Sequence, residues 1–134
     1  MLDGPREVKI KNGALAVDFD LPMPGVSLIL FSAKPDKAPG KVMGLRANPS
    51  PSLLGLDEIM LGWKPLDSRV VRTYEVLYSE SPDGPFQRVN KSDLVSAAFL
   101  HVREKSGTGY YKVRAVDYWG RAGEESEVVS CPAR

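Results

Sequence analysis

The clearest strand pattern in this chain is Gly109-Tyr110-Tyr111-Lys112-Val113-Arg114-Ala115-Val116-Asp117-Tyr118-Trp119-Gly120. From Tyr111 to Ala115, apolar side chains alternate with Lys112 and Arg114. This period of two is typical of a β-strand that buries one face and exposes the other. The run then ends in an aromatic pair and a glycine, which indicates a turn directly after the strand.

The rest of the chain repeats this pattern and indicates an all-β fold. Its 134 residues include eleven prolines and twelve glycines, which separate short runs rich in β-branched and aromatic residues. After residue 40, the spacing of these runs predicts a seven-stranded sandwich of the immunoglobulin-like class. The predicted strands are residues 42–47, 59–64, 73–79, 86–89, 97–102, 110–116 and 127–131. The alternation places these side chains in the predicted core: Trp63, Tyr74, Val76, Tyr111, Val113 and Ala115.

About three additional strands are predicted upstream of the sandwich. Residues 8–10 and 14–21 flank Asn12-Gly13, a pair that favours the positive φ angles of a tight hairpin turn, and residues 26–31 form a third apolar run. A proline-rich segment, residues 34–40, predicts a semi-rigid linker. The expected domains are therefore residues 1–33 and 41–134, joined by this linker. Because unpaired apolar strands need cover, we expect residues 8–31 to pack on the later domain or to self-associate.

Composition and charge make nucleic acids, membranes and metal ions unexpected as partners of this chain. Eighteen basic and seventeen acidic residues give a net charge of +1, which supports neither a nucleic acid nor an anionic membrane as partner. The longest apolar run, residues 26–31, is far shorter than the roughly 20 residues that cross a bilayer. Cys131 is the only cysteine and His101 the only histidine. The sequence therefore predicts no internal disulfide, metal site or cofactor.

Residues 39–130 together resemble a fibronectin type III domain. One position departs from the pattern of that family. The corner tyrosine that usually stands six residues before the alanine of the sixth strand would fall at Gly109, which leaves open how the preceding turn is held. The residues that carry the resemblance are Pro39, Leu45, Trp63-Lys64-Pro65, Tyr74 to Tyr78, Tyr111 to Asp117, Gly120, Gly123 and Ser126.

A narrower resemblance covers roughly the last 110 to 115 residues. It is carried by Leu21-Pro22, Val26 to Leu30, Ala33 to Val42, Arg72 to Glu75, and Tyr111 to Trp119. These stretches resemble the C-terminal end of glycoside hydrolase family 39 enzymes of the alpha-L-iduronidase type. The resemblance implies a secreted or lysosomal parent enzyme in which a catalytic TIM barrel is joined to a β-sandwich and a fibronectin type III module. Residues 1–33 would then be remnant strands of that β-sandwich, and the barrel and β-sandwich would be partners of the module.

The same resemblance implies that this chain is not itself an enzyme. Retaining glycosidases need two carboxylates about 5 to 5.5 Å apart, and the resemblance places that pair on a barrel for which this chain is too short. We therefore expect a non-catalytic accessory or scaffold module of an iduronidase- or xylosidase-like hydrolase that mediates interdomain packing. The alternative is an independent adhesion module of the fibronectin type III class that binds a glycan or a protein.

Candidate contact residues follow the sixth strand. Asp117, Tyr118, Trp119 and Arg121 are expected to contact a ligand or a neighbouring domain, because an aromatic pair can stack on a sugar face or pack against protein. A set of basic residues predicts either an exposed stripe for a sulfated glycan or scattered ion pairs. Asn90-Lys91-Ser92 also fits a glycosylation sequon. The basic residues are Arg72, Arg88, Arg103, Lys112 and Arg114.

Overall fold

The chain divides into two units, residues Met1–Asp36 and Lys37–Arg134. The computed structural model describes residues 6–21, 23–27, 29, 31, 33, 35, 37–52, 54–66 and 70–132. Within these residues no helix is long and apolar enough to cross a membrane. The division of the chain into remnant strands, linker and module remains a proposal.

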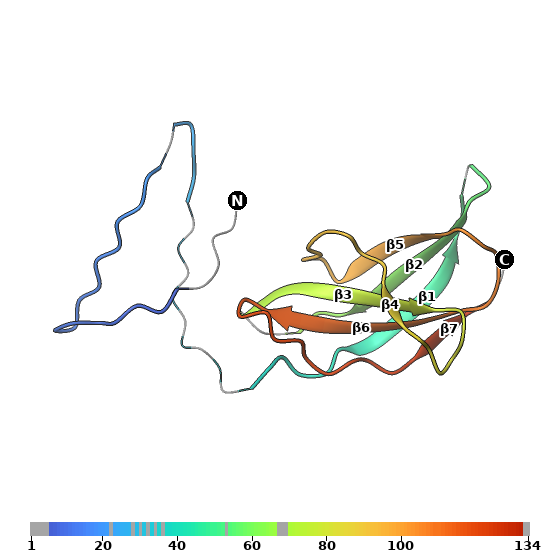
Figure 1. Cartoon of the computed structure of the whole chain (residues 1–134). Coiled ribbons are helices and arrows are strands. Elements are labelled where there is room, and N and C mark those ends of the chain that lie inside the picture. The colour runs from blue at the N-terminus through green and yellow to red at the C-terminus, as the bar shows by residue number, and fades with distance from the viewer. Residues whose placement is uncertain are drawn as a thin grey trace. The chain divides into compact units, whose positions relative to one another are not determined.

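The second unit is a sandwich of two antiparallel sheets (Figure 1). One sheet has the strand order β1-β2-β5 and the other has the order β4-β3-β6-β7. The expectation of a seven-stranded all-β sandwich is therefore confirmed. The strands are β1 (Met43–Ser50), β2 (Asp57–Lys64), β3 (Val71–Ser79), β4 (Gln87–Arg88), β5 (Ala98–Arg103), β6 (Gly109–Asp117) and β7 (Val129–Cys131).

The core lies between the sheets and follows the alternation of the strands. On β6 the buried side chains of Tyr111, Val113 and Ala115 pair in register with residues of β3 that face the same side. On β2 the alternate residues from Ile59 to Trp63 meet them from the other sheet. The structure places all six expected core side chains in this cluster, namely Trp63, Tyr74, Val76, Tyr111, Val113 and Ala115.

Each of the seven strands has at least one boundary that differs from the prediction, by one to three residues, and proline bears on two of these differences. β1 continues to Ser50 through Pro49, since an edge strand tolerates a residue that cannot donate to a ladder. β4 is only two residues long and begins after Pro85 and Phe86, because Pro85 offers no amide to the neighbouring β3.

The first unit has the predicted turn, but two of its expected strands are not formed. Asn12 and Gly13 have φ angles of 51° and 74°, and paired hydrogen bonds join the backbones of Lys11 and Ala14. Among the described residues of this unit, that bridge is the only pairing and no strand is present. The prediction of strands at 8–10 and 14–21 was therefore wrong, because a two-stranded hairpin without a third strand or a packed face is marginal in water.

The third expected strand, residues 26–31, lies partly outside the described residues, because Leu28 and Leu30 are not described. It remains a prediction. Among the described residues of this unit, several large apolar side chains are exposed, including Val17, Phe19 and Leu21. Self-association through residues 8–31 likewise remains a prediction.

Candidate functional site

Asp117 organises the turn that follows β6. Its carboxylate is fully buried. It accepts hydrogen bonds from the backbone amides of Trp119 and Arg121, both at 2.9 Å, and from Nε of Arg121 at 2.8 Å. Gly120 closes the turn with a φ of 76° and donates its amide to the carbonyl of Asp117. Asp117 is therefore a structural residue that fixes where the following side chains lie.

The electrostatics of this turn favour the ionised carboxylate. Burial alone raises the pKa of Asp117, but the hydrogen bonds and charge of Arg121 and the amide of Trp119 more than offset it, so the net pKa lies below its ordinary value. The buried negative charge is thus stabilised by two backbone amides and one guanidinium group. The role expected for Asp117 and Arg121 as direct ligand contacts remains a prediction.

Tyr118 and Trp119 lie on this fixed turn. The amide of Tyr118 donates to the carbonyl of Val70, just before β3, and both aromatic side chains are partly exposed. The guanidinium carbon of Arg121 lies 5.8 Å from the centroid of the Trp119 ring, a distance typical of a cation–π contact. Trp119 therefore presents a positioned aromatic surface to its surroundings.

The chain joins the sandwich at the same end. Pro39 is buried, and a Cβ atom on Gly123 would lie 2.3 Å from the Pro39 carbonyl oxygen, so only glycine permits this approach. Lys41 forms an ion pair with Glu127. We call residues 37–42 and 117–123 the upstream end of the sandwich.

The basic residues expected as a possible stripe are each paired with a carboxylate. Such pairing neutralises the charge that a sulfated ligand would need, and it matches the ion-pair alternative drawn from the sequence. The pairs are Arg72 with Asp93, Arg88 with Glu75, Arg103 with Asp57, Lys112 with Glu125, and Arg114 with Glu75 and Glu125.

His101 lies inside the opposite end of the sandwich. Its Nδ1 atom is 3.0 Å from the Tyr111 hydroxyl, with which it shares a hydrogen bond, and the Tyr78 ring packs edge-on against it with centroids 5.0 Å apart. Burial and the nearby charge of Arg103 lower the pKa of His101, whereas Asp57 opposes the shift. The imidazole is therefore a neutral, structural group at neutral pH.

This environment predicts a pH dependence of stability. Because the pKa of His101 is lower in the folded chain than its ordinary value of about 6.5, the unfolded chain binds the proton more readily. We expect the free energy of unfolding to fall as the pH drops below about 6.5, by at most about 1.4 kcal/mol per pH unit for one proton. Denaturant unfolding between pH 7.5 and 5 measures the slope. His101→Gln should flatten it, and equal slopes in both proteins would contradict the assignment.

Asn90, the acceptor residue of the sequon, is used by the fold. Its side chain is buried; the oxygen accepts from the amide of Val76 at 2.8 Å, and Nδ2 donates to the carbonyls of Tyr74 and Ser92 at 3.0 Å each. Attachment of a glycan to Nδ2 would require this buried amide to leave its partners. The structure thus favours a structural role for Asn90 over a modification site.

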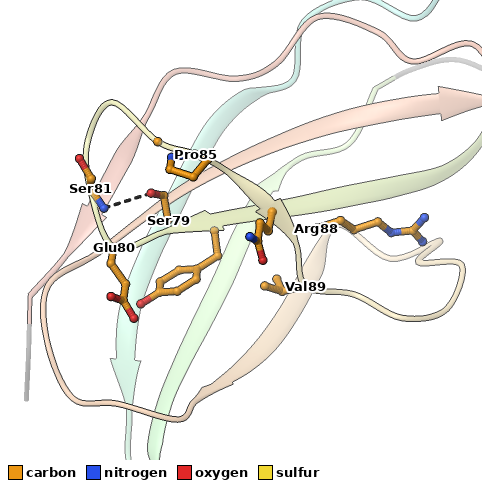
Figure 2. A pocket seen from close by; sticks show the side chains of 9 residues that line it. Ser79, Glu80, Ser81, Pro85, Arg88 and Val89 are labelled. Carbon is orange, nitrogen blue, oxygen red and sulfur yellow. Dashed lines mark hydrogen bonds between the residues drawn. The ribbon is translucent and has the colours of Figure 1, made fainter.

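A hollow of about 370 Å³ lies beside the β3–β4 connection (Figure 2). The amide of Ser81 donates to the Ser79 hydroxyl at 3.0 Å across its rim. Glu80 is the one carboxylate among its lining residues, and Figure 2 shows Arg88 pointing away from it. With a single carboxylate, this hollow does not have the acid pair that glycoside hydrolysis uses.

The part of the chain that the structure describes contains no group of three or more His, Cys, Asp or Glu side chains that could hold a metal ion. Two structural features were not predicted from the sequence. Gly123 contacts Pro39 across a sequence separation that no local pattern encodes. Arg103, however, shares its strand face with Phe99 and His101, so the alternation alone was a signal that it is buried.

Comparison with known proteins identifies relatives that match most of this chain. The sequence profile described as the alpha-L-iduronidase C-terminal domain matches residues 55–132. The alpha-L-iduronidase of the dog, Canis lupus familiaris, is 34% identical over 116 residues, which are 84% of this chain but 17% of that enzyme. The chain thus spans about one sixth of the length of the curated relatives that it matches.

Solved structures agree with this assignment. The crystal structure of the bacterial orthologue of human alpha-L-iduronidase superposes with a TM-score of 0.59 at 34% identity, covering 71% of this chain and 15% of that one. A fibronectin type III-like protein from Clostridium thermocellum superposes with a TM-score of 0.55 at 22% identity, covering 67% of this chain and 88% of that one. The second similarity concerns the fold alone and confirms the fibronectin type III-like class.

Proposed function

Because this chain belongs to the family of alpha-L-iduronidase C-terminal domains, we propose that it is the non-catalytic accessory module of a larger glycoside hydrolase, the parent enzyme. In this proposal the upstream end of the sandwich packs against the part of the parent that carries the catalytic barrel. The module acts as a scaffold, and Tyr118 and Trp119 supply the apolar contact.

The observation that carries this proposal is the position of the aromatic turn beside the incoming chain. Pro39 is packed against Gly123, and the Asp117 turn begins six residues before that glycine. In the parent enzyme, a domain upstream of the module is covalently attached at this end. Contact between the surface of that domain and Trp119 therefore carries only a small entropic cost of association. Tryptophan suits such a contact, since a large ring buries much apolar area for few rotatable bonds.

The distribution of acidic residues supports a non-catalytic role. Three carboxylates that are wholly or largely buried are paired with arginine: Asp57 with Arg103, Glu75 with Arg88 and Arg114, and Asp117 with Arg121. A carboxylate whose oxygens are bound by an arginine guanidinium is not free to exchange a proton with a substrate. These residues stabilise the sandwich and are not proposed as catalytic groups.

Removal of the Trp119 side chain should lower the thermal stability of the parent enzyme more than that of the isolated chain. We expect Trp119→Ala to lower the melting temperature of the catalytic part of the parent by several degrees, corresponding to about 1–3 kcal/mol of lost apolar contact. Differential scanning calorimetry of the parent and of the isolated chain separates the two effects. A drop of equal free energy in both would mean that Trp119 acts only within the module.

Leu54 offers a matched control. It is 82% exposed and lies in the β1–β2 connection, at the opposite end of the sandwich from Trp119. Leu54→Ala should leave the melting temperature of the parent enzyme unchanged. If Leu54→Ala and Trp119→Ala lowered it equally, packing through the upstream end would be contradicted. Saturable binding of an oligosaccharide by the isolated chain, lost in Trp119→Ala, would instead favour the adhesion-module alternative.

A further inference from the structure

Gly109 occupies the position where a corner tyrosine is expected, and it leaves space for other groups. The residue is buried at the start of β6. A Cβ atom there would lie 2.6 Å from Cε2 of Tyr78 and 3.0 Å from Nη1 of Arg103. A tyrosine therefore cannot stand at position 109 with these neighbours in place, and the guanidinium of Arg103 lies against the glycine instead.

All five N–H donors of Arg103 have acceptors. Nε and Nη2 bind the two carboxylate oxygens of Asp57 at 2.9 and 3.0 Å, the bidentate geometry that favours arginine over lysine. Nη1 donates to the carbonyls of Gly107 and Cys131, and Nη2 also donates to the carbonyl of Pro132. With 1% of its side chain exposed, the guanidinium is a fully satisfied buried cation.

These five bonds join three segments that are distant in sequence. Asp57 begins β2, Gly107 lies in the connection between β5 and β6, and Cys131 ends β7. In related sandwiches a tyrosine hydroxyl pins this connection to nearby backbone. Here one guanidinium reaches the same connection and, in addition, the C-terminal strand.

We infer that the ion pair of Arg103 and Asp57 replaces the corner tyrosine and holds β7 in place. This corner ion pair fixes the β5–β6 connection through Gly107 and the end of the sandwich through Cys131 and Pro132. The inference is independent of the proposed packing at the upstream end, because it concerns the opposite end of the module. It explains how a strand of three residues, Val129–Cys131, remains attached to β6.

Cys131 provides a native probe of this attachment. It is the only cysteine of the chain, and its side chain is fully buried. A thiol reagent can modify it only when β7 opens, so the labelling rate under native conditions reports the fraction of molecules in which β7 is detached. Denaturant unfolding of the same proteins gives their global stability separately.

Arg103→Lys is the decisive variant, because it keeps the charge but loses the forked geometry and at least two of the five donors. We expect Cys131 in Arg103→Lys to be labelled roughly 10- to 100-fold faster than in the wild type, the effect of one lost charge-assisted hydrogen bond on an opening equilibrium. Asp57→Asn, which keeps one acceptor oxygen, should give a smaller acceleration and serves if Arg103→Lys does not fold.

Val76→Ala is the matched control for general destabilisation, since Val76 lies in the middle of β3, away from the corner ion pair. In Val76→Ala, the labelling rate of Cys131 should rise only by the factor that corresponds to the measured loss of global stability. Labelling in excess of that relation for the Arg103 and Asp57 variants supports the inference. If the Cys131 labelling rates of all variants follow one common dependence on global stability, the corner ion pair does not hold β7. The same conclusion follows if Arg103→Lys is labelled at the wild-type rate.

Discussion

Trp63→Ala is expected to lower the free energy of unfolding by about 3–5 kcal/mol, the range typical of large-to-small changes in a packed core. Trp63 is 7% exposed and lies edge-on to Tyr74, with ring centroids 5.3 Å apart. Removal of the indole leaves a cavity where the two sheets meet and frees the Tyr74 ring, whose hydroxyl accepts from the amide of Leu66. Denaturant unfolding followed by circular dichroism measures the loss.

Trp63→Phe is the control for this prediction. The indole Nε1 finds no hydrogen-bond acceptor among the described residues, so phenylalanine removes a buried unpaired donor and retains most of the ring. We expect Trp63→Phe to cost less than about 1.5 kcal/mol. If alanine and phenylalanine destabilise equally, aromatic packing against Tyr74 is not what Trp63 contributes.

Asp117→Ala is expected to cost about 3 kcal/mol, because it removes one partner of a buried ion pair and three hydrogen bonds at once. The amides of Trp119 and Arg121 would lose their acceptor, so the turn that carries Trp119 should loosen as well. Thermal unfolding measures the stability, and the fluorescence of Trp119 in a Trp63→Phe background reports the turn. Arg121→Gln retains the two backbone bonds and should cost much less.

The pH dependence of this effect has a definite sign. Hydrogen bonds hold the pKa of Asp117 below its ordinary value, so its contribution is fully present above the unfolded pKa of about 3.9 and is lost as the pH falls through the folded pKa. The difference in stability between the wild type and Asp117→Ala should therefore shrink below about pH 4. A difference that stays constant down to pH 2 would show that the ionised carboxylate is not the stabilising species.

The sandwich was predictable because each long strand buries one face. On β6, for example, Tyr111 to Ala115 alternate so regularly that strand, core face and following turn can be read from the residues alone. The resemblance to the iduronidase family rests on the same stretch, which ends in Asp117, Tyr118 and Trp119. Local periodicity and turn chemistry were sufficient for the fold class and for the location of the aromatic turn.

Contacts between distant segments were not predictable in the same way. The approach of Pro39 to Gly123 and the five bonds of Arg103 depend on how the two sheets close, which no window of sequence encodes. The structural use of Asn90 was not predictable for a related reason, since a tripeptide pattern does not reveal that the side-chain amide is buried and hydrogen-bonded. The predicted strands at residues 8–10 and 14–21 are not formed, because alternation indicates a face to be buried but does not supply a partner strand.

If Trp119 faces another part of the parent enzyme, its side chain is shielded there from solvent, and oxidative footprinting read by mass spectrometry detects that shielding. The measurement compares the rate of Trp119 oxidation in the isolated chain with that in the parent enzyme, with the Leu54 peptide as internal reference. We predict that oxidation of Trp119 falls several-fold in the parent, as expected for a ring that loses most of its solvent contact, whereas Leu54 is unchanged. Equal oxidation of Trp119 in both proteins would contradict packing through the upstream end.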